Sequence, residues 1–406
     1  MKQIKKIGIL TSGGDCAGLN AVIWGAAKMA HRHNIELLAI TNGYAGLYNL
    51  DTTMPVSLTP ELTDDMIRTH IAGSEIGNSR VRISRIKDEH TYEKIKNNLK
   101  KHEIDALIIA GGDDTGSVVV DLVKNEIDCV HVPKTMDLDL QTYSVGGDST
   151  IHRISNFIND LRTTIKTHSR LLIVEVFGRY AGHTAFRSGI GADADCILIP
   201  EISIDYNVIY SHFKQRFSER LKRNKFNASI YTIVAAEAIK GPDGKFFTDA
   251  SKSKDSFGHV KLRGFGANLR KQLESLAKDD KDYWKTILSE NGTYIKGINE
   301  IPEVRDILPG HLVRCGYSTP YDISFGKQCG GSAVLLLLKG KTGVTVVGLE
   351  EGKIKYMPIK DAIKQRHVNP KDVEFYEQLG VCFGRKPKDS FVPVIEEVEG
   401  KIIRYM

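Results

Sequence analysis

Short apolar runs alternate with helical stretches along most of the chain. The strand candidates are residues 7–10, 36–40, 106–110, 129–132, 171–176, 196–199, 231–235 and 343–347, and the helix candidates are residues 21–30, 115–124, 151–164, 208–222, 266–276 and 324–337. Strands that alternate with helices are typical of parallel sheets, so the pattern predicts an α/β fold. The polar stretch 240–255 contains several turn-forming residues and is expected to be a mobile loop.

Three of these strands end in loops rich in glycine or carboxylates. The loops are residues 11–20 (TSGGDCAGLN), 111–114 (GGDD) and 133–139 (PKTMDLD). The carboxyl ends of parallel strands meet at one sheet edge and lead into helix N-termini, so we expect the loops to form one phosphate-binding site. Carboxylates at such an edge need a cation, and Asp113 is expected to hold Mg²⁺, which proteins usually share with substrate phosphates.

A simpler explanation exists for each loop alone. The tetrapeptide GGDD is more often a strand-ending turn with solvated carboxylates. Three such loops in the first third of the chain favour the phosphate site. The first loop is not followed by Gly-Lys-Ser/Thr, and it lacks G-x-G-x-x-G with an acidic residue about twenty positions later, so the chain is a poor candidate for a P-loop or Rossmann protein.

The same segments resemble the phosphofructokinase family in one collinear order. The resemblance rests on residues 10–20, 111–114, 133–139, 174–182, 200–201, 236–237 and 310–314. More specifically, they resemble the pyrophosphate-dependent branch, the diphosphate–fructose-6-phosphate 1-phosphotransferases. This resemblance implies two similar three-layer α/β domains with mainly parallel sheets. It also implies reversible phosphorylation of fructose 6-phosphate at O1 with pyrophosphate and Mg²⁺.

The choice of branch depends on Asp114 and Lys134, because both positions are glycine in ATP-dependent members of the family. A carboxylate at 114 repels the α-phosphate of ATP. Two unit charges about 4 Å apart cost roughly 4 kcal/mol at an effective dielectric near 20, on the order of a thousandfold in affinity. Lys134 supplies a compact positive charge for a pyrophosphate oxygen. Gly13, Gly14 and Arg80 complete the implied donor-binding set.

The resemblance also implies which residues perform the chemistry. Asp137 corresponds to the general base that takes the proton of the sugar 1-hydroxyl. Thr135 and Asp139 correspond to residues that orient the sugar or support the base, and Arg179 to the group that stabilises the developing charge. Leu138 departs from the family, which has a polar residue at that position.

The sugar phosphate has its own implied binding residues. They are Phe177, Gly178, Glu237, His311 and Arg314, together with Arg170 and Arg305. In the family the last two arginines reach the 6-phosphate from a neighbouring subunit. We therefore expect a homodimer or homotetramer in which the subunits share the sugar site.

The resemblance further implies two discontinuous domains. A phosphoryl-donor domain is expected at residues 1–147 plus about 313–365, and a sugar-phosphate domain at about 148–312 plus 366–406. Two other functions remain open. One is an ATP-dependent 6-phosphofructokinase, and the other is a non-catalytic, sugar-phosphate-binding regulatory subunit of the same fold.

Composition is that of an ordinary globular protein, with 41% hydrophobic and 26% charged residues. The net charge of +6 comes without any run of lysine and arginine, so no nucleic-acid partner is expected. The six cysteines show no paired spacing, which predicts a reducing compartment and no disulfide framework. No apolar run is long enough to span a membrane, and no signal segment precedes the first strand, so a cytoplasmic enzyme is expected.

Overall fold

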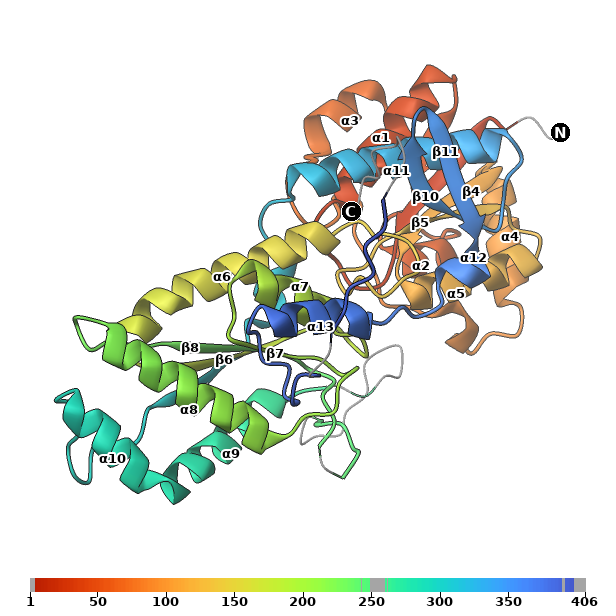
Figure 1. Cartoon of the computed structure of the whole chain (residues 1–406). Coiled ribbons are helices and arrows are strands. Elements are labelled where there is room, and N and C mark those ends of the chain that lie inside the picture. Colours follow the sequence, from red (N-terminus) through yellow and green to blue (C-terminus); the bar gives the residue numbers. More distant parts are fainter. Residues whose placement is uncertain (1–3, 242, 249–259, 261, 389–390, 398–406) are drawn as a thin grey trace. The chain divides into compact units, whose positions relative to one another are not determined.

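A computed structural model describes residues 4–397 except 242, 249–259, 261 and 389–390. The chain divides into two compact units (Figure 1). Unit 1 contains Met1–Thr150, Ser253–Val260 and His311–Arg366, and unit 2 contains Ile151–Lys252, Lys261–Gly310 and His367–Met406. Within the predicted loop 240–255, Lys240 pairs with Phe246 in an isolated bridge, and residues 242 and 249–255 lie outside the described residues.

Unit 1 is built on a seven-stranded sheet of order β11-β10-β5-β4-β1-β2-β3. The strands are β1 Lys6–Thr11, β2 Glu36–Ala39, β3 Val56–Ser57, β4 Ala106–Gly111, β5 Cys129–Pro133, β10 Val344–Glu350 and β11 Lys353–Pro358. The strands β2, β1, β4, β5 and β10 run parallel, and the short β3 and the hairpin strand β11 add antiparallel edges. The prediction of an α/β fold with mainly parallel sheets is confirmed.

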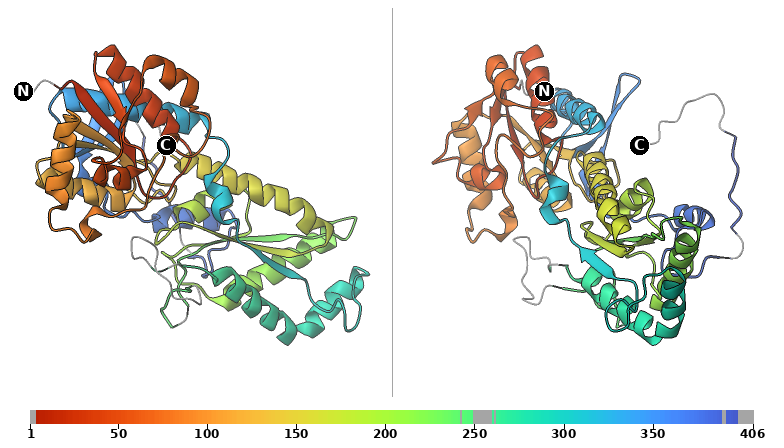
Figure 2. Two further views of the ribbon diagram at one scale, coloured as in Figure 1. Left: turned by 180° about the vertical axis from the view of Figure 1, so that it is seen from behind. Right: turned by 90° about the vertical axis from the view of Figure 1, so that its left-hand side faces the viewer.

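Helices cover both faces of this sheet (Figure 2). On one face lie α1 Leu19–Arg32, α3 Pro60–Met66 and α11 Pro320–Leu338, and on the other lie α2 Gly43–Tyr48, α4 Thr91–Lys101, α5 Asp113–Lys124 and α12 Ile359–Ala362. Side chains alternate between the faces of a strand. Accordingly, Ile7 and Ile9 of β1 belong to the core beneath α1 and α11, whereas Leu10 belongs to the core on the opposite face.

Unit 2 is built on a four-stranded parallel sheet of order β7-β8-β6-β9. Its strands are β6 Leu171–Val176, β7 Cys196–Leu198, β8 Tyr231–Ala236 and β9 Val304–Ile307. Its helices are α7 His183–Gly191, α8 Tyr206–Arg223, α9 Phe265–Asp279, α10 Lys281–Glu290 and α13 Pro370–Gln378. An aromatic core of Phe213, Phe217, Tyr231 and Trp284 packs α8 and α10 onto one face of the sheet.

Helix α6, Gly147–Thr167, begins in unit 1 and continues into unit 2. The fully buried carboxylate of Asp322 holds its first turn, accepting hydrogen bonds from the amides of Gly146 and Ser149, each at 2.8 Å. Burial raises the pKa of Asp322, and these bonds oppose the shift. Asp322 was not among the residues predicted to be important. The available signal was the capping pattern that starts at Thr319, whose hydroxyl caps α11 by accepting from the Asp322 amide.

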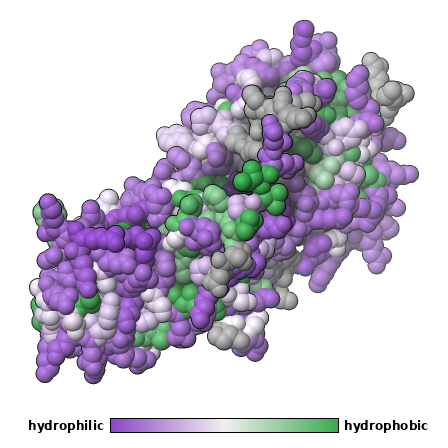
Figure 3. Space-filling model, viewed as in Figure 1, coloured by the Kyte–Doolittle hydropathy of each residue, from purple (hydrophilic) through white to green (hydrophobic). Residues whose placement is uncertain are grey.

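The molecular face seen in Figure 3 is largely hydrophilic, with scattered apolar patches. Among the helices of the described residues, none combines the length and apolar character needed to cross a membrane.

Candidate active site

The three predicted loops lie at the carboxyl edge of the unit 1 sheet, because β1, β4 and β5 are neighbours in register. Thr11 of β1 pairs with Ala110 of β4, and Gly111 pairs with Pro133 of β5. The Lys134 amide extends this pairing by donating to the Gly111 carbonyl at 2.9 Å. The residues that follow the strands therefore emerge side by side, as the sequence predicted.

Three cationic side chains converge on Gly14 in the first loop. The ammonium of Lys134, a residue only 2% exposed, donates to the Gly14 carbonyl oxygen. The guanidinium of Arg314 donates to the Asp15 carbonyl at 2.8 Å. A Cβ on Gly14 would lie 2.7 Å from Nη1 of Arg314 and 3.3 Å from Nη2 of Arg80. The guanidinium groups thus lie close to the backbone of Gly14, and the combined charge of the three side chains suits a phosphate-bearing ligand.

The buried lysine has an unusual environment. Burial lowers the pKa of Lys134, while the nearby Cys16 and Asp15 oppose that shift. Gly13 has a φ of +88°, and a Cβ there would lie 3.6 Å from Nζ of Lys134. The ammonium group thus lies directly against the glycine loop.

The carboxylates Asp113 and Asp114 are the first two residues of α5, after the N-cap Gly112. This helix was predicted to begin at Thr115, but both aspartates are in its first turn and not in the loop. Negative side chains are stabilised there by the helix dipole. Within the described ranges, no three His, Cys, Asp or Glu side chains come together as a metal-binding group. One carboxylate beside a phosphate site still fits Mg²⁺, which commonly takes one or two protein ligands plus phosphate oxygens.

The loop after β5 folds back on itself around Asp137. The Thr135 hydroxyl donates to Oδ2 of Asp137 at 3.3 Å and accepts from the Asp137 amide at 3.1 Å. Thr135, Asp137 and Asp139 are all at most 9% exposed. Leu138 has a φ of +57° and is buried against Gly147. A Cβ added to Gly147 would lie 2.2 Å from Cδ2 of Leu138. The apolar side chain of Leu138 therefore belongs to the core, with 1% of its surface exposed.

A buried histidine that sequence analysis did not select supports this edge. Nε2 of His131 donates to the Gly111 carbonyl at 2.9 Å, and Nδ1 accepts from the Thr345 hydroxyl at 3.0 Å. The carbonyl can only accept, so the Nε2 proton is fixed. Burial lowers the pKa of His131 to about 4.

A second set of predicted residues lies at the carboxyl edge of the unit 2 sheet. Phe177, Gly178 and Arg179 follow β6, and Glu237 follows β8, its neighbour. Oε1 of Glu237 accepts from the amides of Gly178 and Arg179 at 3.3 and 2.9 Å. A Cβ on Gly178 would lie 2.6 Å from the Thr184 hydroxyl oxygen, so the turn requires glycine. The buried Glu237 therefore fixes the backbone that carries Arg179.

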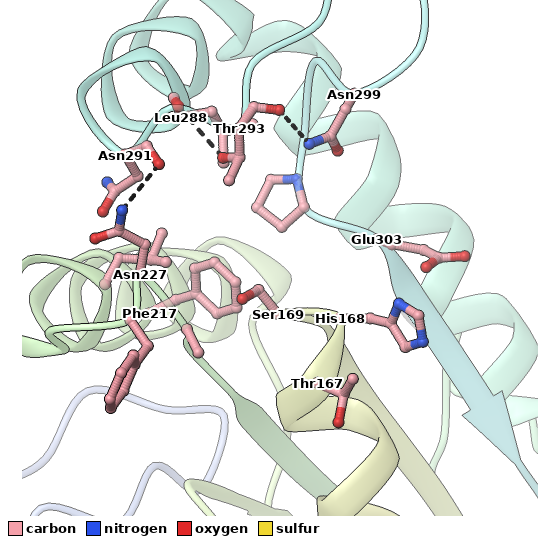
Figure 4. Close-up of a pocket in the computed structure, with 14 residues that line it drawn as sticks. Thr167, His168, Ser169, Phe217, Asn227, Leu288, Asn291, Thr293, Asn299 and Glu303 are labelled. Carbon is pink, nitrogen blue, oxygen red and sulfur yellow. Dashed lines mark hydrogen bonds between the residues drawn. The ribbon is translucent and has the colours of Figure 1, made fainter.

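The predicted arginines Arg170 and Arg305 lie at the opposite, amino edge of the same sheet. Arg170 directly precedes β6, and Arg305 is the second residue of β9. Both guanidinium groups form ion pairs with Glu303. Glu303 also lines a cavity of about 570 Å³ together with His168 (Figure 4). Glu303 was not predicted as a site residue; it directly precedes β9, two positions before Arg305.

The predicted sugar-phosphate residues therefore fall into three groups. Arg170 is separated from the level of Glu237 by the six-residue strand β6, a length of roughly 20 Å, and Arg305 is paired with the second residue of that strand. His311 and Arg314 lie in the 3₁₀ helix Gly310–Arg314, in the part of the chain assigned to unit 1. No single edge of the unit 2 sheet holds the whole set.

Comparison with known proteins gives consistent matches over most of the chain. A family model described as Phosphofructokinase matches residues 6–337. A pyrophosphate–fructose 6-phosphate 1-phosphotransferase of Dictyoglomus thermophilum is 31% identical over 384 residues, covering 94% of this chain and 99% of the relative. The ATP-dependent 6-phosphofructokinase 2 of Clostridium perfringens is 31% identical over 399 residues, with coverage of 94% and 99%.

Solved structures show the same architecture. A pyrophosphate-dependent phosphofructokinase from Marinobacter aquaeolei superposes with a TM-score of 0.66 over 98% of this chain and all of that chain, at 18% identity. At that identity the likeness concerns the fold alone. Since relatives named for either phosphoryl donor are equally similar in sequence, donor choice has to be argued from individual residues.

Proposed function

Because the chain belongs to the phosphofructokinase family, we propose that it transfers a phosphoryl group from pyrophosphate to O1 of fructose 6-phosphate. The products are fructose 1,6-bisphosphate and phosphate, and the reaction is reversible. The choice of donor depends on the buried Lys134, whose ammonium donates a hydrogen bond to the carbonyl of Gly14.

Lys134 favours pyrophosphate for two reasons. Its side chain fills space beside the glycine loop that a residue without a side chain would leave open for a larger donor. Its charge joins that of Arg80, which suits a compact ligand with four ionisable oxygens. Asp114 in the first turn of α5 adds a carboxylate that repels the extra phosphate of ATP.

Phosphoryl transfer depends mainly on positioning and on neutralisation of charge. Asp137 takes the proton of the sugar 1-hydroxyl, and the Thr135 hydroxyl holds its carboxylate in place. Arg179 stabilises the charge on the transferred group, while Glu237 fixes the Arg179 backbone. Asp113 would hold Mg²⁺, which when bound neutralises phosphate oxygens.

The sugar site is proposed to be completed by a second subunit. Arg170 lies roughly 20 Å along the sheet from the level of Glu237, and Arg305 is paired with the second residue of β6, so within one chain both arginines are at the edge opposite to Glu237. A homodimer or homotetramer would bring the amino edge of one unit 2 sheet to the carboxyl edge of another.

The test is to measure initial rates with pyrophosphate and with ATP, each with fructose 6-phosphate and Mg²⁺. We expect pyrophosphate to be the better donor. An ATP-dependent 6-phosphofructokinase is the alternative, and the similarity to the Clostridium perfringens enzyme favours it. Faster turnover with ATP would replace our proposal with that alternative.

A non-catalytic regulatory subunit is disfavoured because Asp113, Asp137 and Arg179 are all present. Binding of fructose 6-phosphate, measured by calorimetry, without turnover under either donor would support it instead.

A further inference from the structure

Cys196 and Cys382 lie side by side in unit 2, although they are far apart in sequence. Cys382 forms a parallel bridge with Cys196 on the outer side of β7. The Cys382 amide donates to the Asp195 carbonyl at 3.0 Å, and the Ile197 amide donates to the Cys382 carbonyl at 2.8 Å. Neighbouring strands lie about 4.8 Å apart, which is within the range of about 4.4–6.8 Å for Cα atoms joined by a disulfide.

The two cysteines interact electrostatically and differ in exposure. A hydrogen bond from Cys196 lowers the pKa of Cys382, and the Gly384 amide adds a second bond to the Cys382 sulfur at 3.3 Å. Burial raises the pKa of Cys196. Cys382 is 7% exposed, whereas Cys196 is completely buried. Cys382 is therefore the sulfur that a small oxidant meets first, and the bond from the Gly384 amide favours its thiolate.

The other cysteines lack such a partner in the contacts that the structure describes. Cys16 and Cys129 direct their thiols to backbone carbonyls, of Val145 and Ile127 respectively. Burial raises the pKa of both, that of Cys16 to about 12. Cys329 is buried, and Cys315 alone is exposed. Among the six cysteines, only Cys196 and Cys382 are paired with each other across neighbouring backbone segments.

We propose that Cys196 and Cys382 are a redox modification site that closes to a disulfide when a peroxide reaches it. The Cys382 thiolate attacks one oxygen of hydrogen peroxide, forming a sulfenic acid and releasing hydroxide. The Cys196 sulfur, losing its proton, then attacks the sulfenic sulfur and expels its oxygen as water. Two thiols are oxidised and one peroxide is reduced to two waters. The bond would tie the segment after α13 covalently to β7 and enclose residues 196–382.

The test uses the full chain treated with hydrogen peroxide, followed by alkylation and peptide mass spectrometry. We expect a peptide that joins Cys196 to Cys382, two thiols lost per chain, and full reversal by dithiothreitol. The linked chain should also migrate faster than the reduced chain on a denaturing gel without reductant, because the bond closes a long loop.

Two variants provide controls. Cys315→Ser should still form the linked peptide, whereas Cys382→Ser should not. Should Cys382→Ser fail to fold, the wild-type peptide map decides by itself. The proposal is overturned if peroxide oxidises Cys315 while Cys196 and Cys382 remain thiols, or if Cys382 proceeds to sulfinic acid with Cys196 still reduced.

Discussion

Replacing the buried Lys134 by methionine should weaken the use of pyrophosphate without destabilising the fold. Methionine has a similar length and no charge, so the change removes the ammonium that lies on the Gly14 carbonyl. A hydrogen bond to a charged group contributes about 1.5–3 kcal/mol. At about 1.4 kcal/mol per tenfold, kcat/KM for pyrophosphate should fall about 10- to 150-fold.

Folding should be affected much less. The variant no longer buries an ammonium group, which offsets the loss of one hydrogen bond to a partly exposed carbonyl. We expect the KM for fructose 6-phosphate and the thermal midpoint to stay close to those of the wild type. Lys124→Met is the matched control, because that lysine is at the exposed end of α5 and only pairs with Asp121.

Steady-state kinetics with varied pyrophosphate, together with thermal melting, is the assay. The reasoning is refuted if folded Lys134→Met keeps kcat/KM for pyrophosphate within threefold of the wild type. Equal losses for Lys134→Met and Lys124→Met would refute it too, since the effect would then not depend on the buried site.

The other predictions concern the base, the donor, the shared site and acid stability. Asp137→Asn should lower kcat by about 10²–10⁴-fold with an unchanged melting temperature; near-normal turnover would remove Asp137 as the base. Changing Asp114 and Lys134 together to glycine should raise the ratio of ATP to pyrophosphate turnover, and an unchanged ratio would contradict the steric and electrostatic account of donor choice. Mixing inactive Arg170→Ala and Asp137→Asn chains should restore part of the activity if subunits share the site, whereas no recovery in verified mixed oligomers would argue against sharing. His131 has a folded pKa of about 4, below its unfolded value near 6.5, so the unfolded state binds more protons between these values. Stability should fall by about 3 kcal/mol as pH drops through that window, and denaturant melts of His131→Gln should lack this part of the loss.

Much of the fold was predictable because buried parallel strands are continuous apolar runs. Every predicted strand coincides with one in the structure. The edge strand β11 was missed because its exposed sequence, KIKYMP, lacks such a run. Strand β9 was missed because its sequence, VRDI, carries two charged residues.

The candidate site was predictable to the extent that strand ends determine positions. The three loops of unit 1 follow neighbouring strands, so their adjacency follows from the strand order. Long-range pairings could not be read from the sequence. The ion pairs of Glu303, the Arg314 contact with the Asp15 carbonyl and the bridge between Cys196 and Cys382 all depend on which segments the fold brings together.

Helix α6 restricts how this gene could be recombined with those of its relatives. Residues 150 and 151 are assigned to different units but are consecutive inside that helix, and residues 310 and 311 share the 3₁₀ helix Gly310–Arg314. A crossover at either boundary would join half-helices of different parents and leave their packed faces mismatched. Viable chimaeras should therefore exchange segments at exposed loops within a unit, and unit boundaries should be poor crossover points.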